Sequence, residues 1–82
     1  MTAALTLYTR KDCCLCDAMK AAVAAAAKKF LLALEEIDVD SSADLAARYG
    51  GEVPVLFING RKAFKYRVEA RELERRLKSE IS

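Results

Sequence analysis

The chain has 82 residues and a formal net charge of +2, with 14 basic and 12 acidic side chains. This length supports one modest hydrophobic core, so we expect a single domain over residues 1–82. The near balance of charge offers no basic surface for a nucleic acid or an anionic membrane, and no apolar run approaches the roughly 18 residues of a membrane span. The N-terminus has no leader pattern, so we expect a cytoplasmic protein, and we expect it to be a monomer.

The first predicted strand covers residues 5–8, where apolar and polar β-forming residues alternate. It leads into an alanine-rich helix, predicted from Cys13 to about Lys29 with Asp12 as its N-cap. All three cysteines of the chain lie where this helix begins. Unpaired backbone N–H groups and the positive end of the helix dipole stabilise a thiolate at such a place. We therefore expect a nucleophilic cysteine there.

Cys13 and Cys16 are the two cysteines that we expect to react. On a helix, residues three apart share a face at a separation of about 5–6 Å, which a disulfide can span. Cys14 is turned by about 100° from Cys13, and a bond between adjacent residues would strain the peptide between them. The chain has no histidine, which excludes Cys-His catalysis and His-containing zinc sites. The purely structural alternative is that the cysteines are buried apolar residues.

A second strand is predicted over residues 32–39, and a helical crossover of this length places the two strands parallel. A short helix is then expected over residues 44–49. Ser41 or Ser42 caps its start, and it ends at the glycine pair Gly50-Gly51.

The last part of the chain predicts two strands and a helix. The apolar run 55–58 is typical of a buried strand, and Asn59-Gly60 is a strong hairpin signal that leads to an antiparallel strand over residues 62–66. Residues 69–81 then form an amphipathic pattern. The apolar face of this predicted helix carries Ala70, Leu73, Leu77 and Ile81.

Four features together resemble the glutaredoxin branch of the thioredoxin-like fold, especially its small bacterial glutaredoxin-like proteins. They are Cys13-x-x-Cys16 after the first strand, Val53-Pro54 before a buried strand, Phe57-Ile58-Asn59-Gly60 at the hairpin, and the closing helix. The resemblance covers nearly the whole chain. It implies an α/β fold with the order β-α-β-(short α)-β-β-α and a four-stranded mixed sheet.

The resemblance also implies a thiol–disulfide oxidoreductase that acts on protein disulfides or glutathione mixed disulfides. Cys13 would be the attacking thiolate and Cys16 the resolving thiol. Arg10 and Lys11 would favour the thiolate, and Pro54 would be a cis-proline. The residues expected to contact the substrate are Arg10, Lys11, Leu15, Val53 and Pro54. No bound cofactor and no metal is implied, and the reductant would be glutathione or a thioredoxin-reductase system.

Two other classes of function stay open at this point. One is a metal or iron–sulfur protein that uses Cys13, Cys14 and Cys16, with a second chain supplying a fourth ligand. The other is a thioredoxin-fold module that binds a partner with little turnover of its own. The choice of reductant is open as well, because Lys65-Tyr66-Arg67 stands where the family has a diglycine that approaches glutathione.

Overall fold

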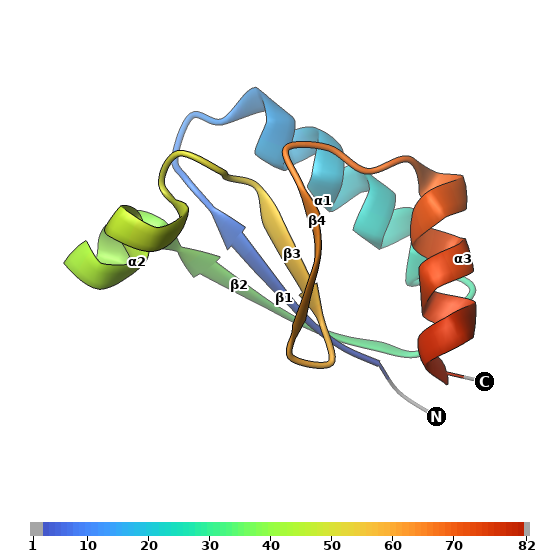
Figure 1. Ribbon diagram of the computed structural model, residues 1–82. Helices are drawn as coiled ribbons and strands as arrows, with labels where there is room; N and C mark the ends of the chain where they lie inside the picture. The colour runs from blue at the N-terminus through green and yellow to red at the C-terminus, as the bar shows by residue number, and fades with distance from the viewer. Residues whose placement is uncertain (1–2, 82) are drawn as a thin grey trace.

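The computed structural model describes residues 3–81 and contains the predicted elements in the predicted order (Figure 1). None of the helices within this described range is long and apolar enough to cross a membrane. One element, the 3₁₀ helix η1, was not predicted. The elements are β1 (Ala3–Thr9), α1 (Cys14–Ala26), β2 (Leu32–Asp38), η1 (Val39–Ser41), α2 (Ala43–Tyr49), β3 (Val55–Ile58), β4 (Arg61–Lys65) and α3 (Ala70–Ile81).

The four strands form one mixed sheet in the order β2-β1-β3-β4, which confirms the predicted fold class. β1 runs parallel to β2 and antiparallel to β3, and β3 pairs antiparallel with β4. Asn59 and Gly60 turn the last two strands with φ angles of 52° and 83°. Positive φ at both central residues matches the twist of a tight hairpin, so the Asn-Gly signal was read correctly.

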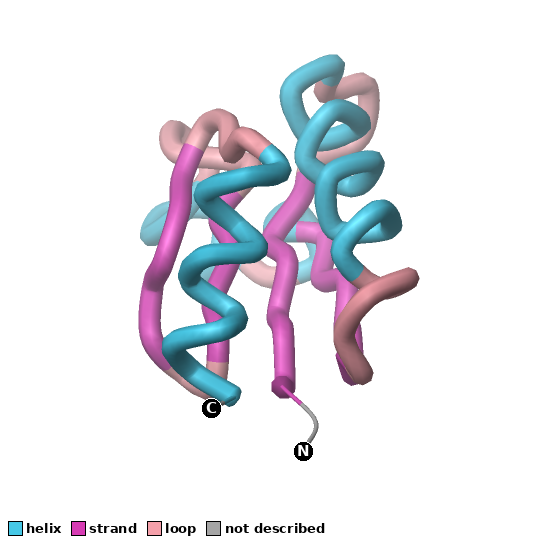
Figure 2. The backbone as a smooth tube through the Cα atoms, turned by 90° about the vertical axis from the view of Figure 1, so that its right-hand side faces the viewer, coloured by secondary structure: helices cyan, strands magenta, loops and turns pink. Residues whose placement is uncertain are grey.

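One face of the sheet is covered by α1 and α3, which lie side by side in front of the strands in Figure 2, whereas α2 lies behind. The main core forms on the covered face, because alternate residues of β1 point toward these two helices. Its buried members are Ala3, Leu5, Leu7, Met19, Val23, Ala26, Leu56, Ile58, Leu73 and Leu77.

The opposite face of the sheet holds α2 through aromatic contacts. The rings of Tyr8 and Tyr49 stack with centroids 4.6 Å apart, and Phe57 meets both rings edge-on at 5.5 and 5.9 Å. Such pairs add to the stabilisation that the buried area provides. α2 is thereby fixed next to the loop that precedes β3.

Several predicted boundaries and faces were wrong. α1 begins at Cys14 with Cys13 as its N-cap, because Asp12 has a left-handed φ of 60° that a capping residue does not adopt. α1 also ends at Ala26, earlier than predicted. On α3, Leu73 and Leu77 are buried as expected but Ala70 is exposed, since it occupies the first turn. The predicted burial of Ile81 lies outside the described side chains.

Candidate active site

Three segments meet at the end of the sheet where β1 stops. Tyr8 of β1 pairs with Val55 of β3, so the chain that leaves β1 and the loop that enters β3 are neighbours. The residue after β4, Tyr66, donates its backbone N–H to the Pro54 carbonyl at 2.8 Å. We call residues 10–16 the dithiol turn and residues 50–54 the proline loop.

Cys13 is the N-cap of α1, and its sulfur accepts a hydrogen bond from the Cys16 backbone N–H at 3.2 Å. This N–H is one of the groups that a helix start leaves without an intrahelical partner. A sulfur in this position is close to the positive end of the helix dipole, which favours negative charge. Cys13 is also only half-buried, so part of the residue is exposed to solvent.

Cys16 differs from Cys13 in exposure and in acidity. Its side chain is buried, with 1% relative exposure. Burial is the largest cause that raises the pKa of Cys16 from 9.0 to about 11; the hydrogen bond with Cys13 raises it further, and the Arg10 backbone opposes the rise. Cys16 therefore keeps its proton at neutral pH. All three cysteines are free thiols, and both Cys14 and Leu15 are exposed beside this pair.

The proline loop presents unpaired backbone groups beside a buried proline. The Val53–Pro54 peptide bond is cis, as the resemblance implied. Pro54 is buried and Val53 is half-buried. Within the described residues, the N–H and C=O groups of Val53 form no hydrogen bond. An extended peptide that brings its own N–H and C=O groups could pair with Val53.

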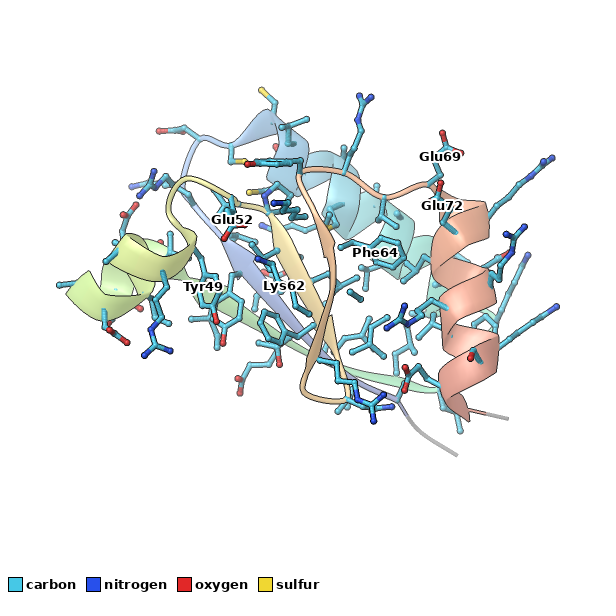
Figure 3. The ribbon with its side chains drawn as sticks, in the orientation of Figure 1. Tyr49, Glu52, Lys62, Phe64, Glu69 and Glu72 are labelled. Carbon is cyan, nitrogen blue, oxygen red and sulfur yellow. The ribbon has the colours of Figure 1, made fainter. Side chains whose placement is uncertain are left out.

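Side chains from β4 and the residue after it hold the proline loop. Glu52 accepts hydrogen bonds from the Nζ atoms of Lys62 at 3.0 Å and Lys65 at 3.2 Å, and Figure 3 shows Glu52 and Lys62 beside each other. These two bonds lower the pKa of the Glu52 carboxyl below its ordinary 4.5. The Tyr66 hydroxyl lies 3.4 Å from the Gly51 carbonyl oxygen, and Tyr66 has a left-handed φ of 67°.

The two predicted cations have different environments. The Arg10 guanidinium binds Asp40 and the Gly50 carbonyl, so its observed contacts are with these groups and not with a cysteine. Lys11 is exposed and forms no ion pair in the part of the chain that the structure describes. Sequence reasoning missed Asp40 and Glu52, and no local pattern marks either of them as a partner of this site.

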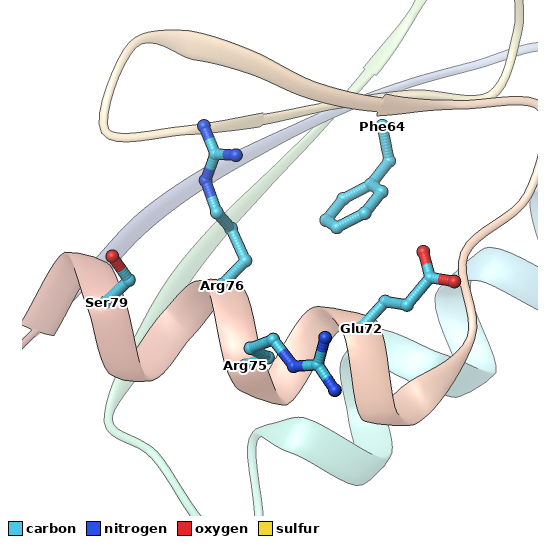
Figure 4. Close-up of a pocket in the computed structure, with 5 residues that line it drawn as sticks. All are labelled: Phe64, Glu72, Arg75, Arg76 and Ser79. Atoms are coloured by element: carbon cyan, nitrogen blue, oxygen red, sulfur yellow. The ribbon is translucent and has the colours of Figure 1, made fainter.

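Two of the grooves among the described residues bear on the site, one beside α3 and one beside residues 67–69 that lead into it. One, of about 460 Å³, lies between β4 and α3 and contains no cysteine (Figure 4). Its lining residues are Phe64, Glu72, Arg75, Arg76 and Ser79. The other, of about 290 Å³, includes Met19, which is three residues after Cys16 on the same buried face of α1. Its lining residues are Ala18, Met19, Arg67, Val68 and Glu69. The second groove is the one adjacent to the dithiol turn.

The metal-binding alternative finds no ligand set here. Over residues 3–81, no three His, Cys, Asp or Glu side chains are arranged to hold a metal ion. In particular, Cys13, Cys14 and Cys16 do not form such a group within these residues.

Comparisons with known proteins agree with this architecture. The family described as Glutaredoxin-like domain (DUF836) matches residues 4–78. The X-ray structure of Northeast Structural Genomics target protein XcR50 from X. campestris is 37% identical, with a TM-score of 0.78, over 92% of this chain and 96% of that chain. Its solution structure gives 38% identity and a TM-score of 0.77, over 93% and 94%. A mutant thioredoxin from Halobacterium salinarum NRC-1 is 27% identical, with a TM-score of 0.67, over 94% and 73%.

Proposed function

We infer the function of this chain from its family: it belongs to the Glutaredoxin-like domain family, and we propose that it is a thiol–disulfide oxidoreductase. The dithiol in this proposal is Cys13 and Cys16. The observation that carries it is the difference between the two sulfurs. Cys13 accepts an N–H at the start of α1 and is accessible, whereas Cys16 is buried and protonated.

The proposed reaction proceeds in two exchanges. The Cys13 thiolate attacks one sulfur of the substrate disulfide, forms a Cys13–substrate S–S bond and releases the other substrate sulfur as a thiolate. Cys16 then loses its proton and attacks the Cys13 sulfur, which releases the second substrate thiolate. Two electrons pass from the protein dithiol to the substrate, the released thiolates take up protons, and the Cys13–Cys16 disulfide remains.

The substrate in this proposal is a disulfide carried by a peptide chain, or a mixed disulfide with glutathione. A peptide would pair with the free backbone groups of Val53, and the exposed Leu15 would contact it beside the reacting sulfur, while the buried Pro54 would support the loop. The groove that includes Met19 and Arg67 would receive the rest of the substrate. Lys11, which is exposed, would meet acidic groups of the partner.

The oxidised protein must then be reduced, and we propose glutathione or a thioredoxin-reductase system as the electron donor. The three cysteines are clustered in the sequence and not spread as the disulfide framework of a secreted domain, so we propose a cytoplasmic location. No resident cofactor is needed for thiol–disulfide exchange.

Cysteine variants test the proposed reaction. With dithiothreitol as the reductant, Cys13→Ser should reduce neither hydroxyethyl disulfide nor insulin above the rate of the buffer. After the dithiothreitol has been removed, Cys16→Ser should perform only the first exchange with the substrate and accumulate a mixed disulfide on Cys13, visible by mass spectrometry. Cys14→Ser is the matched control, since it removes an exposed thiol next to the pair. A Cys13→Ser protein with normal turnover would disprove the mechanism.

A second assay identifies the reductant. The wild-type protein should be supplied with a small mixed disulfide and either glutathione with glutathione reductase or a thioredoxin-reductase system. Turnover with glutathione would show that the protein has glutaredoxin activity, even though Tyr66 and its neighbours stand where the family has a diglycine that approaches glutathione. Turnover only with the reductase would assign it as a reductant of the thioredoxin kind, and no turnover with either would favour a binding module.

A further inference from the structure

The Arg10 guanidinium is bound on two sides at the start of the dithiol turn. Its Nε and Nη2 atoms donate to the two carboxylate oxygens of Asp40 at 3.2 and 3.1 Å, and its Nη1 donates to the Gly50 carbonyl at 3.1 Å. An exposed ion pair usually contributes little, but a bidentate arginine–carboxylate pair is the stronger exception. Arg10 therefore connects β1, η1 and the end of α2 where the proline loop begins.

Both partners of Arg10 are themselves held in place. The Asp40 backbone N–H donates to the Asp38 carboxylate at 2.9 Å, and the Ser41 hydroxyl donates to the Asp38 carbonyl at 2.6 Å. The Gly50 N–H donates to the Ala46 carbonyl at 2.9 Å, which ends α2. Arg10 thus binds an exposed carboxylate whose backbone is fixed in η1 and a carbonyl at the end of α2.

Gly50 lies in a tight space. Its φ angle is −56°, which any residue adopts, so backbone conformation does not require a glycine here. A Cβ atom at this position would clash first with the Ala46 carbonyl oxygen, and it would lie 2.8 Å from the Arg10 Nη2 atom. The Ala46 carbonyl is therefore the main reason that a side chain does not fit here, and the guanidinium is a second close neighbour.

We propose that Arg10 is a positioning residue of the oxidoreductase proposed above, and that through Asp40 and Gly50 it holds the proline loop in register with the dithiol turn. Val53 and Cys13 then face one substrate segment together. Asp40 balances the charge of the guanidinium, so Arg10 acts on the placement of the substrate and not on the charge of the thiolate. The substrate class that depends on it is a disulfide carried by a peptide, whose backbone can pair with Val53.

The first test compares two substrates with a matched control. In Arg10→Gln the fork to Asp40 is lost, and we expect KM for insulin to rise about tenfold with dithiothreitol as the reductant. Hydroxyethyl disulfide lacks a peptide backbone, so the rise in its KM should be several-fold smaller than the rise for insulin. Arg48→Gln is the matched control, because it removes an exposed arginine of α2 that pairs with Asp44 at 3.4 Å. It should change the KM of neither substrate. If KM rises equally for both substrates in Arg10→Gln, the proposal is wrong.

A second variant distinguishes the two possible roles of Arg10. Asp40→Asn removes the charge that balances the guanidinium. If Arg10 stabilised the thiolate, this change would increase the rate at which iodoacetamide alkylates Cys13 below neutral pH. If Arg10 positions the loop, the alkylation rate of Cys13 stays that of the wild type while KM for insulin rises. The double variant Arg10→Gln/Asp40→Asn should then have the same KM for insulin as Arg10→Gln alone.

Amide hydrogen exchange measures how firmly the proline loop is held and requires no catalytic turnover. It therefore tests this proposal separately from the proposed function. The Glu52 N–H in the proline loop donates to the Tyr49 carbonyl at 2.8 Å. Arg10→Gln should make this amide exchange faster, and Arg48→Gln should not. If the wild type reduces no disulfide, the oxidoreductase function is wrong while the exchange result still stands. If exchange at Glu52 is the same in both variants, the positioning role is wrong whatever the activity.

Discussion

The dithiol turn and the proline loop lie at the same end of the sheet, but different kinds of contact hold them. In the dithiol turn, the Cys13 sulfur and carbonyl accept from the backbone N–H groups of Cys16 and Asp17, at 3.2 and 3.3 Å. These partners are three and four positions away in the sequence. The proline loop also has local backbone bonds, but the side chains that bind it come from residues between 10 and 40 positions away. They are Arg10, Lys62, Lys65 and Tyr66.

This difference separates the reactive groups from the groups that position a substrate. The environment of Cys13 comes from the start of a single helix, so it forms wherever α1 forms. The proline loop is placed only after β1, α2 and β4 have come together. Changes in the turn should therefore affect every disulfide substrate alike, whereas changes around the loop should affect peptide substrates most.

The largest stability effect should come from a residue on which both regions depend. Leu56 on β3 pairs with Leu7 on β1 and is fully buried, and these two strands lead to the proline loop and the dithiol turn. We expect Leu56→Ala to lower the free energy of unfolding by about 2–5 kcal/mol, as for other buried leucines. The measurement is urea unfolding followed by circular dichroism.

A matched leucine on the edge strand controls for the change of residue type. The Leu34 side chain is 44% exposed on β2, so Leu34→Ala should change the free energy of unfolding by less than about 0.5 kcal/mol. If the two variants lose similar free energies of unfolding, the packing of β1 against β3 is not what stabilises the two regions.

An intermediate effect should follow from the protonation of Cys16. The pKa of Cys16 is raised to about 11 from 9.0, so the folded chain keeps a proton that the unfolded chain has lost between these values. This contribution to stability is complete below pH 9 and is lost as the pH rises toward 11, and the urea midpoint should fall over this range. Cys16→Ala should weaken the fall.

The same difference should appear as selective alkylation. At about pH 8, iodoacetamide should modify Cys13 and Cys14 before Cys16, because burial keeps Cys16 protonated and inaccessible. Peptide mass mapping measures the order. Equal modification of the three cysteines under native conditions would contradict the contrast between the two reacting sulfurs.

The smallest effect should come from Glu52, whose contacts lie at the exposed side of the proline loop. Glu52→Gln removes the charge that meets Lys62 and Lys65, and exposed ion pairs contribute little to global stability. We therefore expect the urea midpoint to stay near that of the wild type while the loop amides exchange faster. Because the pKa of Glu52 lies below 4.5, the wild-type loop should loosen only as the pH falls below that value.

Much of this architecture could be predicted because it depends on near neighbours in the sequence. The apolar run Val55–Ile58 and the turn Asn59-Gly60 determine a strand and a hairpin within a few residues. The placement of Cys13 and Cys16 at a helix start is of the same kind. The prediction of Asp12 as the N-cap was wrong, because the helix is capped by the next residue, Cys13. Only the path of the chain out of β1 decides between two adjacent residues.

The sequence by itself thus determined the order of the elements, the fold class and the pair of cysteines that we propose to react. Only the tertiary structure decided that Arg10 binds Asp40 and Gly50, which are 30 and 40 positions away. Helix and strand patterns reflect backbone propensity and side-chain period over one or two turns of chain. They contain no information on which distant charges meet, because those contacts form only when packed strands and helices bring the two side chains within hydrogen-bond distance.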